Sequence, residues 1–271
     1  MSSPRRLRLW PCVSLVLSIF FAAAAAAATP YREGASTLFI GHSFLVPVAR
    51  QFDVVASATG LGRHRTELVF APGGKGTPGR MWESVRLKNR VTGILERGDI
   101  EIFGVGGMGR TTTFEQLDNW LRLAVSYNPA TTFVVAQTHM PGGPRTEAER
   151  YHSRTVAAGD QLYEVVQRLR RAHPGAEIVF LNHGFVASDM SRRFAAGTLS
   201  DITQLAGRGS NALFLDRSIG HAGRMMTYVS ALVWMERLYG RSASEIGRSP
   251  FNRADVLSLV DTWRAAHARH E

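Results

Sequence analysis

Cysteine is nearly absent from this sequence. Among 271 residues the only cysteine is Cys12, close to the amino terminus. One cysteine cannot form an internal disulfide, and the body of the chain has neither a thiol nucleophile nor a cysteine-based metal site. The fold must therefore be stabilised by its hydrophobic core, for which a chain of this length with 45% hydrophobic residues is sufficient.

Lysine is also rare, since only Lys75 and Lys88 occur, yet the 32 basic residues exceed the 22 acidic ones and give a formal charge of +10. The excess is arginine, and it is spread along the chain rather than gathered in a tail or on one helix face. This distribution does not favour a nucleic-acid partner. Internal repeats and low-complexity tracts are missing, which excludes solenoid and fibrous classes.

Only one long hydrophobic run is present, and it lies at the amino end. Basic residues Arg5, Arg6 and Arg8 precede an apolar stretch that passes into alanines up to Ala28. This pattern predicts a signal peptide over residues 1–28, a linker over 29–35 and one domain over 36–271. We expect an exported protein, periplasmic or secreted, that does not contact the membrane after cleavage. The alternative is an uncleaved membrane anchor.

The rest of the chain alternates between short apolar runs and amphipathic stretches. The runs predict buried strands at Thr37–Ile40, Glu67–Ala71, Ile100–Val105, Thr132–Gln137, Glu177–Asn182 and Ala212–Leu215. The stretches predict helices at Val48–Thr59, Arg80–Arg97, Phe114–Tyr127, Glu147–His173, Thr227–Tyr239 and Ala254–Ala268. This alternation predicts a single α/β domain, a three-layer α/β/α sandwich with a central parallel sheet.

Ser43 is the first candidate for chemistry. It follows a predicted strand and Gly41, and it precedes a helix whose first turn contains Pro47. In open parallel sheets the ligand site lies beyond the carboxyl ends of the strands. A serine in such a strand-to-helix turn exposes its hydroxyl there, which suits a nucleophile; the alternative is an ordinary helix N-cap.

Asp216 and His221, far along the chain, supply the groups that a serine nucleophile requires. The imidazole takes the serine proton, and the carboxylate fixes the tautomer of the imidazole. The order along the chain is Ser, Asp, His. Without Ser43, the simpler interpretations would be a helix cap for Asp216 and a loop histidine for His221.

At this point the chain resembles the SGNH (GDSL-type) hydrolases. Residues 38–44, LFIGHSF, resemble the first block of that family, and residues 216–234, DRSIGHAGRMMTYVSALVW, resemble its closing block. Residues 70–83, FAPGGKGTPGRMWE, are placed like the second block. The resemblance implies the family's flavodoxin-like fold, with Ser43 as nucleophile, His221 as base and Asp216 as its partner. It also implies that the backbone amides of Ser43 and of Gly73 or Gly74 bind the oxyanion.

Two features depart from the family pattern. The family usually spaces its Asp and His three positions apart, whereas here they are five apart. The third block, which normally carries an asparagine oxyanion donor, is replaced by GVGGMG, with Met108 or a glycine at that place. Losing one donor typically costs about 10²- to 10³-fold in rate. Candidates for a relocated donor are Gln137, His139 and Asn182, each of which could instead satisfy loop backbone.

The expected function is an exported serine esterase that hydrolyses carboxylic esters, such as an O-acylated carbohydrate, with no cofactor or metal. Two alternatives stay open: a catalytically impaired carbohydrate-binding module on the same fold, and a metal-dependent hydrolase. The second would use Asp216 and four histidines near strand ends, namely His42, His139, His183 and His221. Arg192, Arg193 and Arg208, in a predicted loop region, are either contacts for an anionic substrate or a solvated basic face. Oligomeric state is not indicated.

Overall fold

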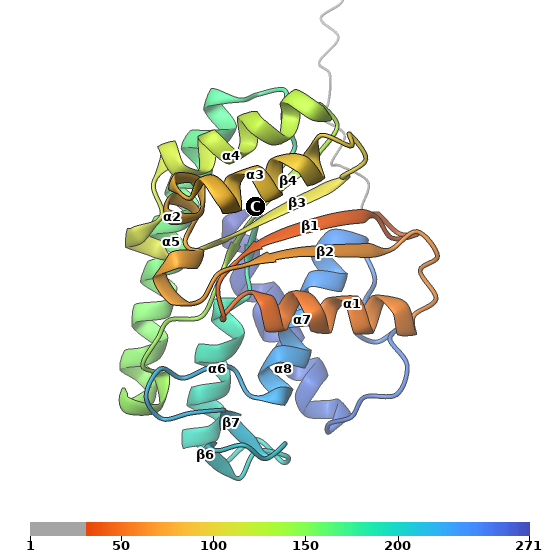
Figure 1. Cartoon of the computed structure of the whole chain (residues 1–271). Coiled ribbons are helices and arrows are strands. Elements are labelled where there is room, and N and C mark those ends of the chain that lie inside the picture. The colour runs from red at the N-terminus through yellow and green to blue at the C-terminus, as the bar shows by residue number, and fades with distance from the viewer. Residues whose placement is uncertain (1–30) are drawn as a thin grey trace, which may run out of the picture.

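The computed structural model describes residues 31–271, and its centre is a five-stranded parallel sheet (Figure 1). The strand order is β2-β1-β3-β4-β5, which is the doubly wound order of flavodoxin-like folds. The strands are β1 (Ser36–Gly41), β2 (Arg65–Phe70), β3 (Ile102–Gly107), β4 (Thr132–Gln137) and β5 (Ile178–Asn182). The expected three-layer α/β/α sandwich is confirmed.

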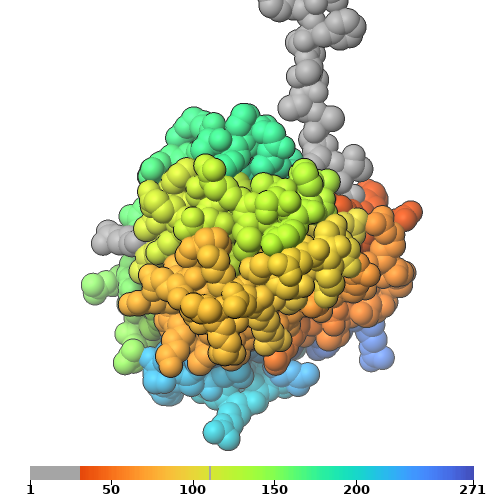
Figure 2. All heavy atoms as spheres, turned by 45° about the horizontal axis from the view of Figure 1, so that its top comes forward, coloured from red at the N-terminus to blue at the C-terminus, as the bar shows by residue number. Residues whose placement is uncertain are grey.

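Helices cover both faces of the sheet. One face carries α2 (Pro78–Glu83), α3 (Val85–Leu95), α4 (Phe114–Tyr127) and α5 (Ala148–Ala172), which form a continuous outer surface in Figure 2. The other face carries α1 (Val46–Ala58), α6 (Gly184–Ala195), α7 (Arg224–Tyr239) and α8 (Arg253–His267). Strands β1, β3, β4 and β5 are buried along their whole length, which explains their continuous apolar runs in the sequence, whereas the edge strand β2 is partly exposed.

Alternate residues along each strand divide the core into two halves. In β1, Phe39 packs towards α1 and α7, whereas Leu38 and Ile40 pack towards α2 and α3. On the first side, Phe39 lies against Trp234 of α7 with ring centroids 4.7 Å apart. The sheet is therefore packed between two apolar helix layers beneath its carboxyl edge.

The sixth predicted strand does not join the central sheet. Residues Ala212–Phe214 form β7, which pairs in parallel with β6 (Gln204–Ala206) in a separate two-stranded sheet. A short apolar run shows that a segment is buried but not which strand it pairs with. The prediction of a strand here is confirmed, whereas its placement after β5 in the same sheet was wrong.

Helix α6 was missed by the sequence analysis, which assigned its residues to a loop. The first eight residues of α6, Gly184 to Ser191, are all buried. A helix that is buried on all sides lacks the polar stripe that reveals an amphipathic helix. Arg192 and Arg193 lie in the last turn of α6 and bond to Asp189. They are therefore structural residues and not part of a free basic loop.

Two further outcomes concern the helices and the amino end. The helix predicted over Arg80–Arg97 is divided into α2 and α3, because the Ser84 side chain caps α3 by accepting a hydrogen bond from the Leu87 amide. The predicted signal peptide over residues 1–28 lies outside the described residues. Among residues 31–271, no helix combines the length and the apolar character needed to cross a membrane.

Candidate active site

Ser43 lies in a tight turn between β1 and α1, at the carboxyl edge of the sheet. The turn is closed by the His42 carbonyl, which accepts hydrogen bonds from the amides of Leu45 and Val46. The Phe44 amide donates to Nδ1 of His42. After β1 the chain forms β2 on one side of it and β3 on the other, so Ser43 follows the strand at which the strand order reverses. Ligands of doubly wound folds bind at this place.

The Ser43 hydroxyl meets the His221 imidazole. Nε2 of His221 lies 3.0 Å from Oγ of Ser43, and Nδ1 lies 2.6 Å from Oδ2 of Asp216. A carboxylate can only accept, so Nδ1 must carry the proton and Nε2 is free to accept from the Ser43 hydroxyl. The structure therefore brings together the three side chains predicted as nucleophile, base and orienting acid.

The wider spacing between Asp216 and His221 is accommodated by a loop that folds around the carboxylate. Oδ1 of Asp216 accepts hydrogen bonds from the amides of Ser218, Ile219 and Gly220 and from the Ser218 hydroxyl. The base of the loop is closed by the Leu215 amide, which donates to the His221 carbonyl over 2.8 Å. A separation of five positions therefore still allows the imidazole of His221 to contact the carboxylate of Asp216.

The same hydrogen bonds keep Asp216 ionised. Burial acts to raise the pKa of this carboxyl, but the Ile219 amide, the His221 imidazole and Ser218 outweigh it and hold the pKa well below its usual range. An ionised Asp216 orients His221 and stabilises the positive charge that the imidazole gains when it takes a proton. Ser218 was not singled out from the sequence, and no motif marks it.

The second block lies beside the nucleophile turn. Gly73 and Gly74, the predicted oxyanion donors, are exposed and begin the short 3₁₀ helix η1 (Gly73–Gly76). Gly76, which the sequence analysis did not single out, contacts the turn most closely. A Cβ on Gly76 would lie 2.7 Å from His42 Cβ and 2.8 Å from the Gly41 carbonyl oxygen. The absence of a side chain at Gly76 thus sets how closely η1 approaches Ser43.

Two of the three candidates for a relocated oxyanion donor do not face Ser43. Gln137 and Asn182 are register partners on β4 and β5 and point towards Gly159 of α5. Nε2 of Gln137 donates to the Thr155 carbonyl, and Oδ1 of Asn182 accepts from the Phe185 amide. Both amides satisfy backbone groups of neighbouring helices, which is a structural role.

His139, the third candidate, lies next to the site but is engaged elsewhere. Nε2 of His139 donates to the carbonyl of Gly220, the residue before His221, over 3.0 Å. Its ring packs on Phe44 at 4.1 Å between centroids, and Phe44 in turn lies 5.3 Å from the His221 ring. Burial lowers the pKa of His139 to about 4, so the imidazole is neutral at physiological pH. This arrangement links the nucleophile turn to the loop that carries His221.

The other two strand-end histidines are buried and neutral. Burial lowers the pKa of His42 to about 4 and that of His183 to about 3. His183 packs edge-on against Trp234. Within residues 31–271, no group of three or more His, Cys, Asp or Glu side chains is arranged to hold a metal ion. The alternative of a metal site built on these histidines therefore has no ligand set in the described chain.

Comparison with known proteins supports the fold. No protein-family model matches the sequence, and no curated protein matches it. A DUF4886 family protein from Bacteroides uniformis superposes with a TM-score of 0.54 over 87% of this chain and 94% of that chain, at 14% identity. The periplasmic domain of a lipopolysaccharide acetyltransferase from Salmonella ser. Paratyphi A gives a TM-score of 0.41 over 74% of this chain and 82% of that chain, at 11% identity. At 14% identity, the similarity to the DUF4886 family protein concerns the fold alone.

Proposed function

We propose that this chain is a serine esterase of the SGNH type, which hydrolyses carboxylic esters such as O-acylated carbohydrates through an acyl-enzyme on Ser43. The observation that carries the proposal is the continuous hydrogen-bonded path from Ser43 through His221 to Asp216. Activation of a serine hydroxyl requires a path of this kind, from the hydroxyl to a base and from the base to a carboxylate.

The reaction follows from the atoms in contact. Oγ of Ser43 attacks the ester carbonyl carbon while Nε2 of His221 takes the hydroxyl proton. The tetrahedral intermediate collapses, the bond to the alcohol oxygen breaks, and His221 returns the proton to the leaving alcohol. Water then attacks the acyl-enzyme by the same route, releases the carboxylic acid and restores the Ser43 hydroxyl.

The negative charge that develops on the oxygen of the tetrahedral intermediate must be stabilised by hydrogen-bond donors. The backbone amides of Ser43 and of Gly73 or Gly74 are our candidates, since η1 packs against the turn that holds Ser43. Neither Gln137 nor Asn182 replaces the family's asparagine, because the side-chain amides of both are bonded elsewhere. We therefore expect a slower enzyme than one with three donors, by about 10²- to 10³-fold.

Location is the second part of the proposal. The basic and apolar pattern of residues 1–28 supports export to the periplasm or secretion, with the mature chain beginning near Thr29. Expression of the full chain in a bacterial host followed by fractionation and amino-terminal sequencing tests this. An unprocessed, membrane-associated chain would support the anchor instead.

The activity is tested with p-nitrophenyl esters and paired serine variants. Ser43→Ala removes the nucleophile, whereas Ser57→Ala changes an exposed serine on α1 away from the site. We expect turnover by the wild type and by Ser57→Ala, and a loss of at least about 10³-fold for Ser43→Ala. Equal turnover by a correctly folded Ser43→Ala protein would exclude the nucleophile assignment. Absence of activity in all three proteins would favour the binding-module alternative.

A further inference from the structure

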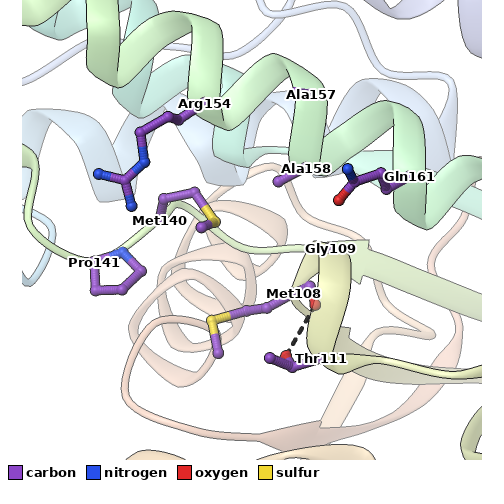
Figure 3. A pocket seen from close by; sticks show the side chains of 9 residues that line it. All are labelled: Met108, Gly109, Thr111, Met140, Pro141, Arg154, Ala157, Ala158 and Gln161. Carbon is purple, nitrogen blue, oxygen red and sulfur yellow. Dashed lines mark hydrogen bonds between the residues drawn. The ribbon is translucent and has the colours of Figure 1, made fainter.

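A groove of about 500 Å³ lies at the carboxyl edge of the sheet, where β3 and β4 end (Figure 3). Met108, which follows β3, and Met140, which follows β4, line it together with residues of α5. Because β3 is the neighbour of β1 and β4 is the neighbour of β3, this groove continues the edge on which Ser43 lies. Met140 also directly follows His139, whose ring packs on Phe44.

The groove is mainly apolar. Its walls are formed by Met108, Met140, Pro141, Ala157 and Ala158, without an aromatic ring. Sugar rings are usually bound by aromatic faces and many polar groups, whereas flexible methionines suit an alkyl chain. The volume is within the range of pockets that enclose ligands much larger than an acetyl group.

The mechanism favours the acyl group as the occupant. The acyl group stays attached to Ser43 between the two halves of the reaction, so it needs a built cavity. The alcohol must leave and water must enter during the same interval, which requires an open approach. The exposed surface at Gly73 and Gly74 offers such an approach on the other side of β1.

One cation in the groove has no acidic partner. Arg154 is exposed, and within residues 31–271 no carboxylate lies within ion-pair distance of its guanidinium. The nearest acidic residues along the chain are engaged elsewhere, since Glu149 lies 3.9 Å from Arg192 and Asp160 lies 2.9 Å from Nε2 of His270. In Figure 3 the guanidinium lies at the Pro141 end of the groove, and the Gln161 amide lies at the other end.

We propose that the groove binds the acyl group of the substrate and that this acyl group ends in a carboxylate, which Arg154 holds. The proposal rests on the proposed function and specifies its substrate class: esters of dicarboxylic acids that are joined to an alcohol through one carboxyl only. The alkyl part lies on the methionines, and the guanidinium presents paired N–H donors to the free carboxylate.

Two esters with the same number of acyl carbons test the charge. Mono-p-nitrophenyl adipate ends in a carboxylate, whereas p-nitrophenyl hexanoate is neutral. We expect wild type to prefer the adipate ester, and Arg154→Gln to lower the adipate-to-hexanoate ratio of kcat/KM about tenfold, as for one charge-assisted hydrogen-bonded pair. Arg171→Gln is the matched control, because Arg171 is exposed at the far end of α5. An unchanged ratio in Arg154→Gln would overturn the proposal.

Binding of the acyl chain in the groove is tested by a substitution that fills part of the groove. Ala157 is exposed on α5 and lines the groove, so Ala157→Phe narrows the cavity without disturbing the core. We expect the hexanoate-to-acetate ratio of kcat/KM to be about tenfold or more in wild type, from the added methylene groups, and to fall several-fold in Ala157→Phe. A preference for the acetate ester in wild type would contradict an acyl site here.

Ligand binding separates this proposal from the proposed function. Calorimetry on Ser43→Ala needs no turnover, and its ligands are the monoamide of adipic acid, which ends in a carboxylate, and neutral hexanamide. Tighter binding of the adipic monoamide, lost in Ser43→Ala/Arg154→Gln, would support the groove assignment even if no ester were hydrolysed. Equal affinity for both amides, or binding of neither, would overturn it, while Ser43-dependent hydrolysis of other esters would leave the proposed function standing.

Discussion

Ser43 and His221 are 178 positions apart in the chain, yet their side chains meet at 3.0 Å. The contact depends on two segments that have no sequence relation to each other: the turn after β1 and the loop before α7. Phe44, which belongs to the turn after β1, packs against both His139 and the ring of His221. The geometry of the pair is therefore set by the packing at one sheet edge, and each contact there can be changed separately.

Asp216→Asn tests the carboxylate in two ways. An amide holds the imidazole in the wrong tautomer, so we expect kcat to fall by about 10³-fold or more. The pKa of Asp216 is depressed in the folded protein, so its contribution to stability is present above the unfolded value of about 3.9 and is lost as the pH falls through the folded value. Thermal unfolding from pH 7 to pH 2 should show wild type more stable at neutral pH, with the difference between the two proteins narrowing below about pH 4. Parallel curves would contradict the hydrogen-bonded carboxylate.

Gly76→Ala tests how closely η1 must approach the nucleophile turn. The added methyl carbon would lie 2.3 Å from the Ala71 carbonyl oxygen as well as against His42, so η1 must move. We expect a destabilisation of about 1–3 kcal/mol and a fall in kcat of about tenfold or more. Gly62→Ala is the matched control, since Gly62 is exposed before the start of β2, nothing lies within 4 Å of its Cβ position and its φ is not positive. Equal behaviour of the two variants would show that the spacing is unimportant.

His139→Phe distinguishes a linking residue from an oxyanion donor. Phenylalanine keeps the packing on Phe44 and removes the hydrogen bond to the Gly220 carbonyl. One neutral hydrogen bond contributes about 0.5–1.5 kcal/mol, so we expect kcat to fall by about tenfold or less. Steady-state kinetics with p-nitrophenyl esters measure this directly. A loss of about 10²-fold or more would instead assign His139 to the oxyanion.

Asn182→Ala should affect stability and leave the chemistry intact. The side chain caps the first turn of α6 through the Phe185 amide and lies among buried groups of α5. We expect a cost of about 1–2 kcal/mol, seen as a lower Tm, with kcat within about twofold of wild type. Should kcat fall strongly while Tm stays constant, Asn182 would act in the site after all.

Much of the fold follows from local sequence patterns. The five central strands and helices α4, α5 and α8 are found within a few residues of their predicted ends, because buried parallel strands and amphipathic helices have strong periodicities. The missed elements lack such patterns: α6 is buried on all sides, and β6 is three residues long. Pairing is also a tertiary property, so the place of β7 outside the central sheet could not be predicted from its apolar run.

The candidate site likewise contains some residues that local motifs predict and others that they do not. Ser43, Asp216 and His221 were singled out because each stands in a recognisable block, and the structure brings their side chains into contact. The supporting groups, Ser218, Gly76 and the His139–Gly220 bond, depend on how loops fold against one another, which no local motif encodes. Gln137 and Asn182 lie at strand ends, as predicted, but their side chains point towards α5 and not towards Ser43.

The central claim is that Ser43 becomes covalently acylated. Incubation of wild type and Ser43→Ala with a fluorophosphonate, followed by intact-mass measurement and peptide mapping, tests it most directly. We expect one adduct on wild type, located on Ser43, no adduct on Ser43→Ala, and strongly slowed labelling in His221→Ala. An adduct on another residue, or ester hydrolysis by wild type that the reagent neither labels nor inhibits, would contradict it.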